Sequence, residues 1–128
     1  MTVNMGTINS ATVVNQAAAH AAQAPAHYQR FIQWIGDGTG LPDTILHIHA
    51  GLAVLMVARV VTRRSLGSLV PLSVVVVAEL FNEVMDRLIY HSWRWPDTLG
   101  DVANTLFWPL AICVGIRLRP MIDRRRGR

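Results

Sequence analysis

Residues 79–87, Glu-Leu-Phe-Asn-Glu-Val-Met-Asp-Arg, follow directly on Val-Val-Val-Val-Ala at 74–78. Carboxylates and an amide therefore lie inside a stretch that otherwise has the composition of a membrane-spanning helix. A central Asp is unfavourable by about 2.5–3.5 kcal/mol on insertion scales, and such residues usually face a bundle interior or an aqueous cavity. The stretch predicts that these polar side chains face protein or water and not lipid.

Three apolar stretches, residues 44–62, 66–90 and 98–118, are each close to the roughly 20 residues that a helix needs to cross a bilayer. Hydrophobic residues make up 52% of the 128-residue chain, and the gaps between the stretches are too short to form domains. The sequence therefore predicts an all-α integral membrane protein whose three transmembrane helices form one domain over residues 43–119. Asp43 or Thr44 is expected to cap the first of these helices. The second is expected to begin near Ser68, with Pro71 in its first turn.

The distribution of arginine predicts the orientation in the membrane. All 12 Lys+Arg residues are arginines, and six of them fall between Arg117 and Arg128. A second cluster, Arg59, Arg63 and Arg64, ends the first span. Cytoplasmic segments carry an excess of basic residues, so both clusters, with the basic tail at 120–128, are expected in the cytoplasm of a bacterium, below its inner membrane. The N-terminus is then periplasmic, and no nucleic-acid partner is expected.

Residues 1–42 are expected to form a tail followed by an amphipathic, interfacial helical segment. An alanine-rich weak helix is predicted to begin at Ser10 and to stop at Pro25. Beyond it, residues 27–35 place their apolar side chains at helical spacing, which predicts a short helix at the membrane interface or on another subunit. Residues 36–42 are predicted to form a tight loop.

A polar stripe marks the second span. Glu79, Asn82, Glu83 and Asp86 are spaced i, i+3, i+4 and i+7, so they share one helix face in the outer half of the bilayer. Arg87 follows Glu83 by four residues, the favourable order for an ion pair on one helix. Aromatic side chains that concentrate at membrane interfaces are expected to anchor the chain there; they are Trp34, Tyr90, Trp93 and Trp95.

The third span carries a matching polar stripe on one face at Asp97, Asp101 and Asn104, and this face continues to Ala111 and Gly115. The simplest packing joins the two polar stripes, with the small residues permitting close approach near the cytoplasm.

Proline and histidine add two further expectations. Pro109 removes an N–H and frees the carbonyl of Thr105, which predicts a kink in the third span. In the first span, His47 shares a face with small and medium residues, whereas His49 points elsewhere.

The single cysteine, Cys113, is expected to be a packing residue.

Three functions remain open for the polar cluster. In the first, its residues hold helices together or dock a partner helix, with His47 at the edge of this face. Alternatively, Glu79, Glu83 and Asp101 act as divalent-cation ligands, with an acid or base among them acting on a lipid head group. A third alternative is a proton or ion path, for which the midplane Glu79 is suggestive.

Residues 79–104 resemble the core of VanZ-like membrane proteins, which carry Glu-Leu-x-Gln, a later Asp, and Asn followed by small residues. Here Glu79-Leu80-Phe81-Asn82 is followed by Asp97 or Asp101 and by Asn104, with Asn82 in place of Gln. The resemblance implies a small multi-span membrane fold and selects no activity.

The outline of the chain is also similar to that of prokaryotic diacylglycerol kinase. Glu79, Asn82 and Asp86 have the spacing of that family's Glu-x-x-Asn-x-x-x-Glu motif, after an N-terminal amphipathic segment. This chain contains no lysine, whereas that family uses one beside its catalytic-site aspartate. Kinase activity is therefore not expected.

The function expected from these observations is that of a small non-enzymatic accessory or assembly subunit of a larger bacterial membrane complex, respiratory or photosynthetic. Its partners would be membrane lipids and other integral membrane subunits. Bound lipid is expected, no cofactor is expected, and a divalent cation is expected only if the chain is an enzyme.

Overall fold

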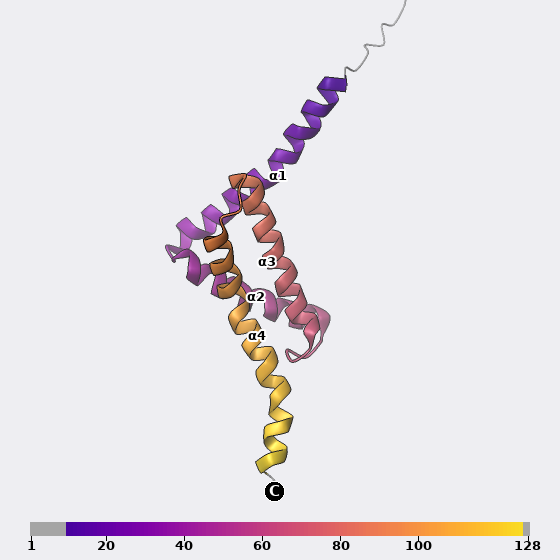
Figure 1. Cartoon of the computed structure of the whole chain (residues 1–128), viewed down its shortest axis with the longest axis vertical. Helices are drawn as coiled ribbons and strands as arrows, with labels where there is room; N and C mark the ends of the chain where they lie inside the picture. The colour runs from indigo at the N-terminus through magenta and orange to yellow at the C-terminus, as the bar shows by residue number, and fades with distance from the viewer. Residues whose placement is uncertain (1–9, 127–128) are drawn as a thin grey trace, which may run out of the picture.

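The computed structural model of the chain describes residues 10–126, and these residues form four helices and no strand. The helices are α1 (Ser10–Thr39), α2 (Asp43–Thr62), α3 (Leu69–Tyr90) and α4 (Trp95–Arg126) (Figure 1). The all-α fold that the sequence predicts is confirmed. The tail at 1–9 and the last two residues lie outside the described residues.

Two helices are long and apolar enough to cross a membrane, namely α2 and the part of α4 from Trp95 to Arg119. α3 has 22 residues, but Glu79, Glu83, Asp86 and Arg87 occupy its second half, so α3 does not have the apolar composition of an ordinary span. The expected third span is therefore not shown by length and composition.

The starts of α2 and α3 agree with the sequence expectations. Asp43 is the first residue of α2 and places a negative charge in its first turn, where the helix dipole favours it. Ser68 caps α3, because its side-chain oxygen accepts a hydrogen bond from the backbone N–H of Val70. Pro71 sits in the first turn of α3, where its missing N–H leaves no partner unsatisfied.

The predicted stop at Pro25 is wrong, because α1 continues through this residue to Thr39. A proline inside a helix costs about 3 kcal/mol, but the alanine-rich turns before it are the strongest helix formers, and the turns after it pack against α3. The predicted loop at 36–42 is correspondingly shorter. It begins at Gly40, whose φ of 63° ends the helix.

α2 lies at the centre of the bundle and packs against both α3 and α4. Its buried residues are Gly51, Leu55 and Ala58, and they meet Val75 of α3 and Cys113 of α4 in a small core. Cys113 is thus buried as a packing residue. α1 joins the bundle only through its second half, against α3, while its first half and the end of α4 extend away in opposite directions (Figure 1).

Gly51 makes the closest approach between α2 and α4. A Cβ atom at this position would overlap the carbonyl oxygen of Thr105 and would lie 3.1 Å from Thr105 Cγ2. Pro109 is four residues after Thr105 and donates no hydrogen bond to that carbonyl. The freed carbonyl is therefore covered by the backbone of a neighbouring helix, and only glycine leaves enough room.

The expectation that Ala111 and Gly115 permit close approach is wrong. Both residues are exposed, and no atom lies within 4 Å of a Cβ built on Gly115. The face of α4 that packs on α2 runs instead through Thr105, Pro109 and Cys113, which are all buried.

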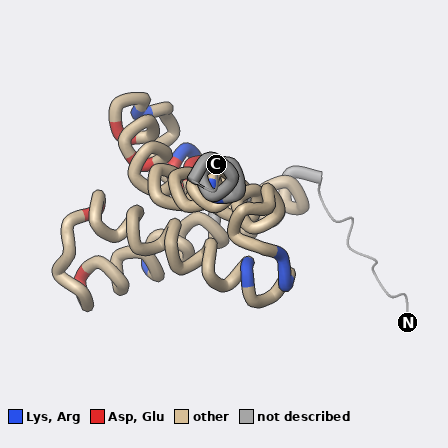
Figure 2. The backbone as a smooth tube through the Cα atoms, turned by 90° about the horizontal axis from the view of Figure 1, so that it is seen from below, with Lys and Arg blue, Asp and Glu red and all other residues tan. Residues whose placement is uncertain are grey.

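The chain covers little of its own apolar surface. Large apolar side chains such as Val61, Val77 and Phe107 are more than 60% exposed. Figure 2 shows one group of basic positions at an edge of the bundle away from the acidic positions, while other basic positions lie beside acidic ones.

Candidate functional site

His47 joins the three helices of the bundle. Its Nδ1 atom lies 3.0 Å from Thr105 Oγ1 and 3.8 Å from Glu79 Oε2. Its Nε2 atom lies 3.5 Å from Asp101 Oδ1 and 3.8 Å from Asp43 Oδ1. The polar stripes of α3 and α4, which the sequence pairs directly, therefore meet on opposite sides of an imidazole from α2.

Two glutamates of α3 are buried inside the chain. Glu79 and Glu83 are each only 5% exposed, and Oε1 of each has no hydrogen-bond partner among the described residues. Their side chains are enclosed by this chain and are not presented outward for a partner helix. Burying a carboxylate without full compensation is costly, so these two groups need an explanation.

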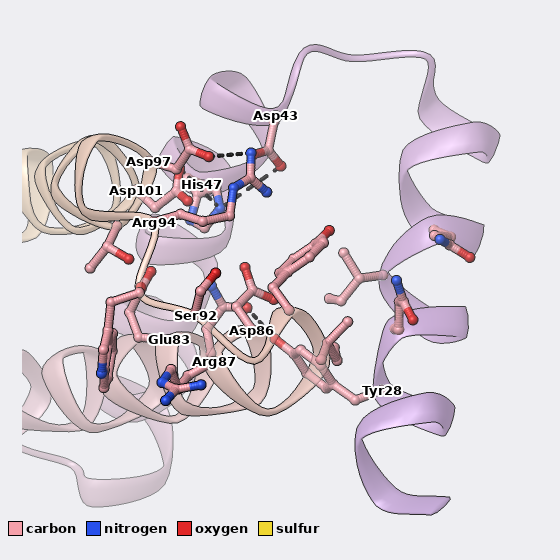
Figure 3. A pocket seen from close by; sticks show the side chains of 18 residues that line it. Tyr28, Asp43, His47, Glu83, Asp86, Arg87, Ser92, Arg94, Asp97 and Asp101 are labelled. Atoms are coloured by element: carbon pink, nitrogen blue, oxygen red, sulfur yellow. Dashed lines mark hydrogen bonds and ion pairs between the residues drawn. The ribbon is translucent and has the colours of Figure 1, made fainter. Parts of the chain in front are cut away.

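A polar pocket of about 220 Å³ lies where α1 crosses the outer ends of α2, α3 and α4 (Figure 3). The ionisable side chains of this polar pocket come from all three helices of the bundle. The acidic ones are Asp43, Glu83, Asp86, Asp97 and Asp101, and the others are His47, Arg87 and Arg94. The carboxylates outnumber the two arginines, so the pocket has an excess of negative charge.

The two arginines of the polar pocket are held differently. Arg94 forms an ion pair with Asp97 and lies 4.9 Å from the centre of the Tyr90 ring. Arg87 does not form the expected pair with Glu83. Its guanidinium lies 5.8 Å from the centre of the Trp93 ring, and no carboxylate of the described residues is within ion-pair distance of it. Arg87 is therefore available to an anion in the pocket.

The expected interface aromatics lie near this pocket or on α1. Trp93 and Trp95 stack with their ring centres 5.6 Å apart, and Trp34 stacks on Phe31 at 6.3 Å. These rings are largely exposed, as is Tyr90. Trp93 and Tyr90 line the polar pocket, whereas Trp34 lies on α1 outside it.

Tyr28 attaches α1 to the pocket. Its hydroxyl donates a hydrogen bond to Asn82 Oδ1, and its ring meets Phe81 edge-on at 5.8 Å. Burial, followed by the nearby carboxylates, raises the pKa of the Tyr28 hydroxyl to about 12. The hydroxyl therefore keeps its proton and remains a donor. Sequence periodicity assigned Tyr28 to an apolar stripe, and no local signal revealed its polar contact.

An apolar groove of about 440 Å³ lies beside the polar pocket, between α1, α2 and α3. It is lined mainly by small and aliphatic side chains, including Ile35, Leu46, Ala53 and Val75. Five residues line both spaces, and they are Tyr28, Ile32, Asp43, His47 and Asn82. The two spaces therefore lie side by side, one polar and one apolar, with His47 among the residues that line both.

The possible metal ligands that lie close together in the structure are not the three that the sequence predicts. Asp43, His47 and Asp101 each offer one ligand atom, and these atoms lie within 4.8 Å of one another. Of the expected set, only Asp101 belongs to this group. Glu79 lies 3.8 Å from His47, and Glu83 lines the same polar pocket. Asp43 was recognised in the sequence only as a helix start. Asn104 is half-buried and lines neither space.

Comparison of the chain with protein-family models, with curated proteins and with solved structures found no match.

Proposed function

We propose that this protein is a membrane protein that binds a phospholipid, with the head group in the polar pocket and an acyl chain in the apolar groove. The observation that carries the proposal is that a 220 Å³ polar space and a 440 Å³ apolar space lie side by side and share five lining residues. A ligand that fills both must be polar at one end and apolar at the other.

One cation of the polar pocket, Arg87, favours a phosphate-containing head group within a lining that is otherwise rich in carboxylates. Arg87 lines the pocket, is held against Trp93 and has no ion-pair partner among the described residues. A guanidinium is well suited to phosphate because its planar donors match the phosphate oxygens. The carboxylates on the opposite side of the pocket suit a cationic group or a metal ion near that phosphate.

The position of the pocket supports a membrane setting. α3 is the third span in this proposal, since its glutamates at 79 and 83 are buried within the chain and its lipid-facing residues, such as Val77 and Leu80, are exposed and apolar. The arginines at 59, 63 and 64 then lie on the cytoplasmic side of a bacterial inner membrane. The polar pocket opens on the periplasmic side, at head-group level.

This geometry favours the lipid-modifying alternative over a docking face. A docking face needs polar side chains that point outward, whereas Glu79 and Glu83 are enclosed by the chain. His47 and Asp101 line a pocket of the size of a head group and are residue types that perform general acid–base catalysis. A bound lipid would place its head group next to them.

The proposal is tested by measuring retained phospholipid on the full-length protein in mild detergent by native mass spectrometry. Arg87→Gln removes the phosphate contact, and Ala53→Phe fills the groove. Each is expected to weaken phospholipid retention about tenfold, because one charge-assisted contact or one blocked chain is worth about 1.4 kcal/mol or more.

Matched controls are Arg64→Gln, which removes an exposed arginine outside the pocket, and Val57→Phe, which adds the same ring on an exposed position of α2 outside the groove. Both should retain phospholipid as the wild-type protein does. Equal retention by Arg87→Gln and Arg64→Gln would argue against the proposed head-group site.

A second candidate function is that of an accessory subunit, which the first half of α1 favours. This half projects from the bundle without packing on it (Figure 1) and exposes Val13 and Val14. We expect stoichiometric larger membrane subunits to co-purify in mild detergent at native expression, and to be lost when residues 10–24 are deleted. Purification of the intact chain as a clean monomer or homotrimer would contradict this candidate.

A further inference from the structure

We propose that Asp43, His47 and Asp101 bind a divalent first-row transition-metal ion of the Zn²⁺ type in the polar pocket. The inference rests on the proposed function, because this ion would occupy the same pocket as the phosphate of the bound phospholipid. The three ligand atoms, one from each side chain, lie within 4.8 Å of one another. One imidazole nitrogen with carboxylate oxygens is a donor set that zinc and its neighbours accept.

The distances around His47 Nε2 fit a shared ion better than direct hydrogen bonds. Nε2 lies 3.5 Å from Asp101 Oδ1 and 3.8 Å from Asp43 Oδ1, beyond the usual 2.7–3.2 Å of an N–H···O bond. In a tetrahedral zinc site with bonds of about 2.0–2.2 Å, neighbouring ligand atoms are separated by about 3.3–3.6 Å. The third separation, between the carboxylate oxygens of Asp43 and Asp101, is within 4.8 Å, so a shift of up to about an ångström brings the three atoms onto one ion.

The other face of the imidazole is arranged as in a metal-binding histidine. Such a histidine commonly donates its second ring N–H to a carboxylate, a carbonyl or another acceptor, which fixes the ring and directs the free nitrogen at the metal. Nδ1 of His47 lies 3.0 Å from Thr105 Oγ1, and Glu79 Oε2 is 3.8 Å away. A proton on Nδ1 therefore leaves the lone pair of Nε2 facing two carboxylates.

A buried glutamate independently points to a cation. Glu83 is 5% exposed, its Oε1 has no hydrogen-bond partner among the described residues, and it lines the same pocket. Figure 3 shows Glu83 on α3, on the side of the pocket opposite Asp43. An ion at Asp43, His47 and Asp101 supplies the positive charge that this enclosed carboxylate lacks, directly or through a bound water.

The site leaves room for both entry and a ligand. The Asp43 side chain is 74% exposed, so an ion can reach the site from the aqueous side. Three protein ligands leave one position of a tetrahedral ion open. That position can accept a phosphate oxygen, with Arg87 binding the same phosphate from across the pocket.

The test uses the full-length protein in mild detergent, stripped with a chelator and then titrated with Zn²⁺ alone in the absence of phospholipid. One Zn²⁺ per chain is expected for the wild-type protein. Asp43→Asn removes an exposed ligand that packs against little, and it should weaken Zn²⁺ binding tenfold or more while the helical circular dichroism stays unchanged. Asp97→Asn removes an equal charge from the same pocket and should change the affinity by less than about twofold.

The inference would be overturned if the wild-type protein did not bind Zn²⁺ stoichiometrically. It would also be overturned if Asp43→Asn and Asp97→Asn weakened Zn²⁺ binding equally, because equal weakening indicates only diffuse attraction to acidic groups. Failure of the phospholipid site is recognised separately. Lipid retention is measured with chelator present, so the two measurements are independent. If the protein binds Zn²⁺ but its lipid retention does not depend on Arg87, the cation site is supported and the proposed lipid-binding function is contradicted.

Discussion

Gly51→Ala is expected to destabilise the bundle by about 2 kcal/mol, because the added Cβ overlaps the carbonyl oxygen of Thr105. The obstacle is backbone, which cannot rotate away as a flexible side chain can. α2 and α4 must therefore separate, which also disturbs the contact between His47 and Thr105. The helix propensity that alanine gains over glycine, about 1 kcal/mol, offsets only part of the cost.

Gly115→Ala provides the matched control. No atom lies within 4 Å of a Cβ at Gly115, so this substitution should be neutral or stabilise α4 by up to about 1 kcal/mol. Both variants can be measured by reversible unfolding of the protein in mixed detergent and SDS micelles, followed by circular dichroism. A Gly51→Ala variant as stable as Gly115→Ala would contradict the described packing of α2 on α4.

His47→Ala should destabilise the protein by about 3 kcal/mol in the presence of a chelator. The substitution removes the imidazole beside Glu79 and leaves that buried carboxylate without a polar neighbour to compensate its charge. It also removes the contacts of the imidazole with Thr105 and Asp101. The same unfolding measurement gives the free-energy difference.

Two comparisons distinguish the loss of the His47 contacts from a general effect of removing a histidine. His49 is exposed, and its side chain hydrogen-bonds to the carbonyl of Ile45 in its own helix, so His49→Ala should change stability by less than about 0.5 kcal/mol. Glu79→Gln combined with His47→Ala should recover part of the loss, because the uncompensated carboxylate is gone. A double variant as unstable as the sum of the two single variants would mean that His47 and Glu79 act independently.

The sequence was sufficient to predict where the helices that carry the site lie in the chain. Apolar length, Asp43 and Ser68 placed the beginnings of α2 and α3, and the spacing of Glu79 and Glu83 put both carboxylates on one face. Those predictions rest on local periodicity and capping, which a chain expresses within a few turns. Proline is also a local signal, but at Pro25 strong flanking helix formers and packing on α3 outweighed it.

The partners of that face could not be predicted in the same way. Periodicity identifies a face but not the helix that meets it, so the stripes of α3 and α4 were paired directly and the central place of His47 was missed. Gly51 and Gly115 are equally plausible close-approach residues in sequence. Only the packing of α2 on Thr105 distinguishes them. Tyr28 joined the site through α1 crossing the bundle, a contact between residues distant in sequence.

The central claim is that a phospholipid fills the adjacent polar pocket and apolar groove. It is tested most directly with a phospholipid that carries a photoreactive group on its acyl chain, cross-linked to the full-length protein in lipid vesicles and mapped by mass spectrometry of peptides. The account predicts labelling concentrated on groove residues such as Leu46, Ala53 and Val75, and its loss in Ala53→Phe. Labelling confined to the outward faces at Val57, Val61 and Phe107, unchanged by Ala53→Phe, would contradict it.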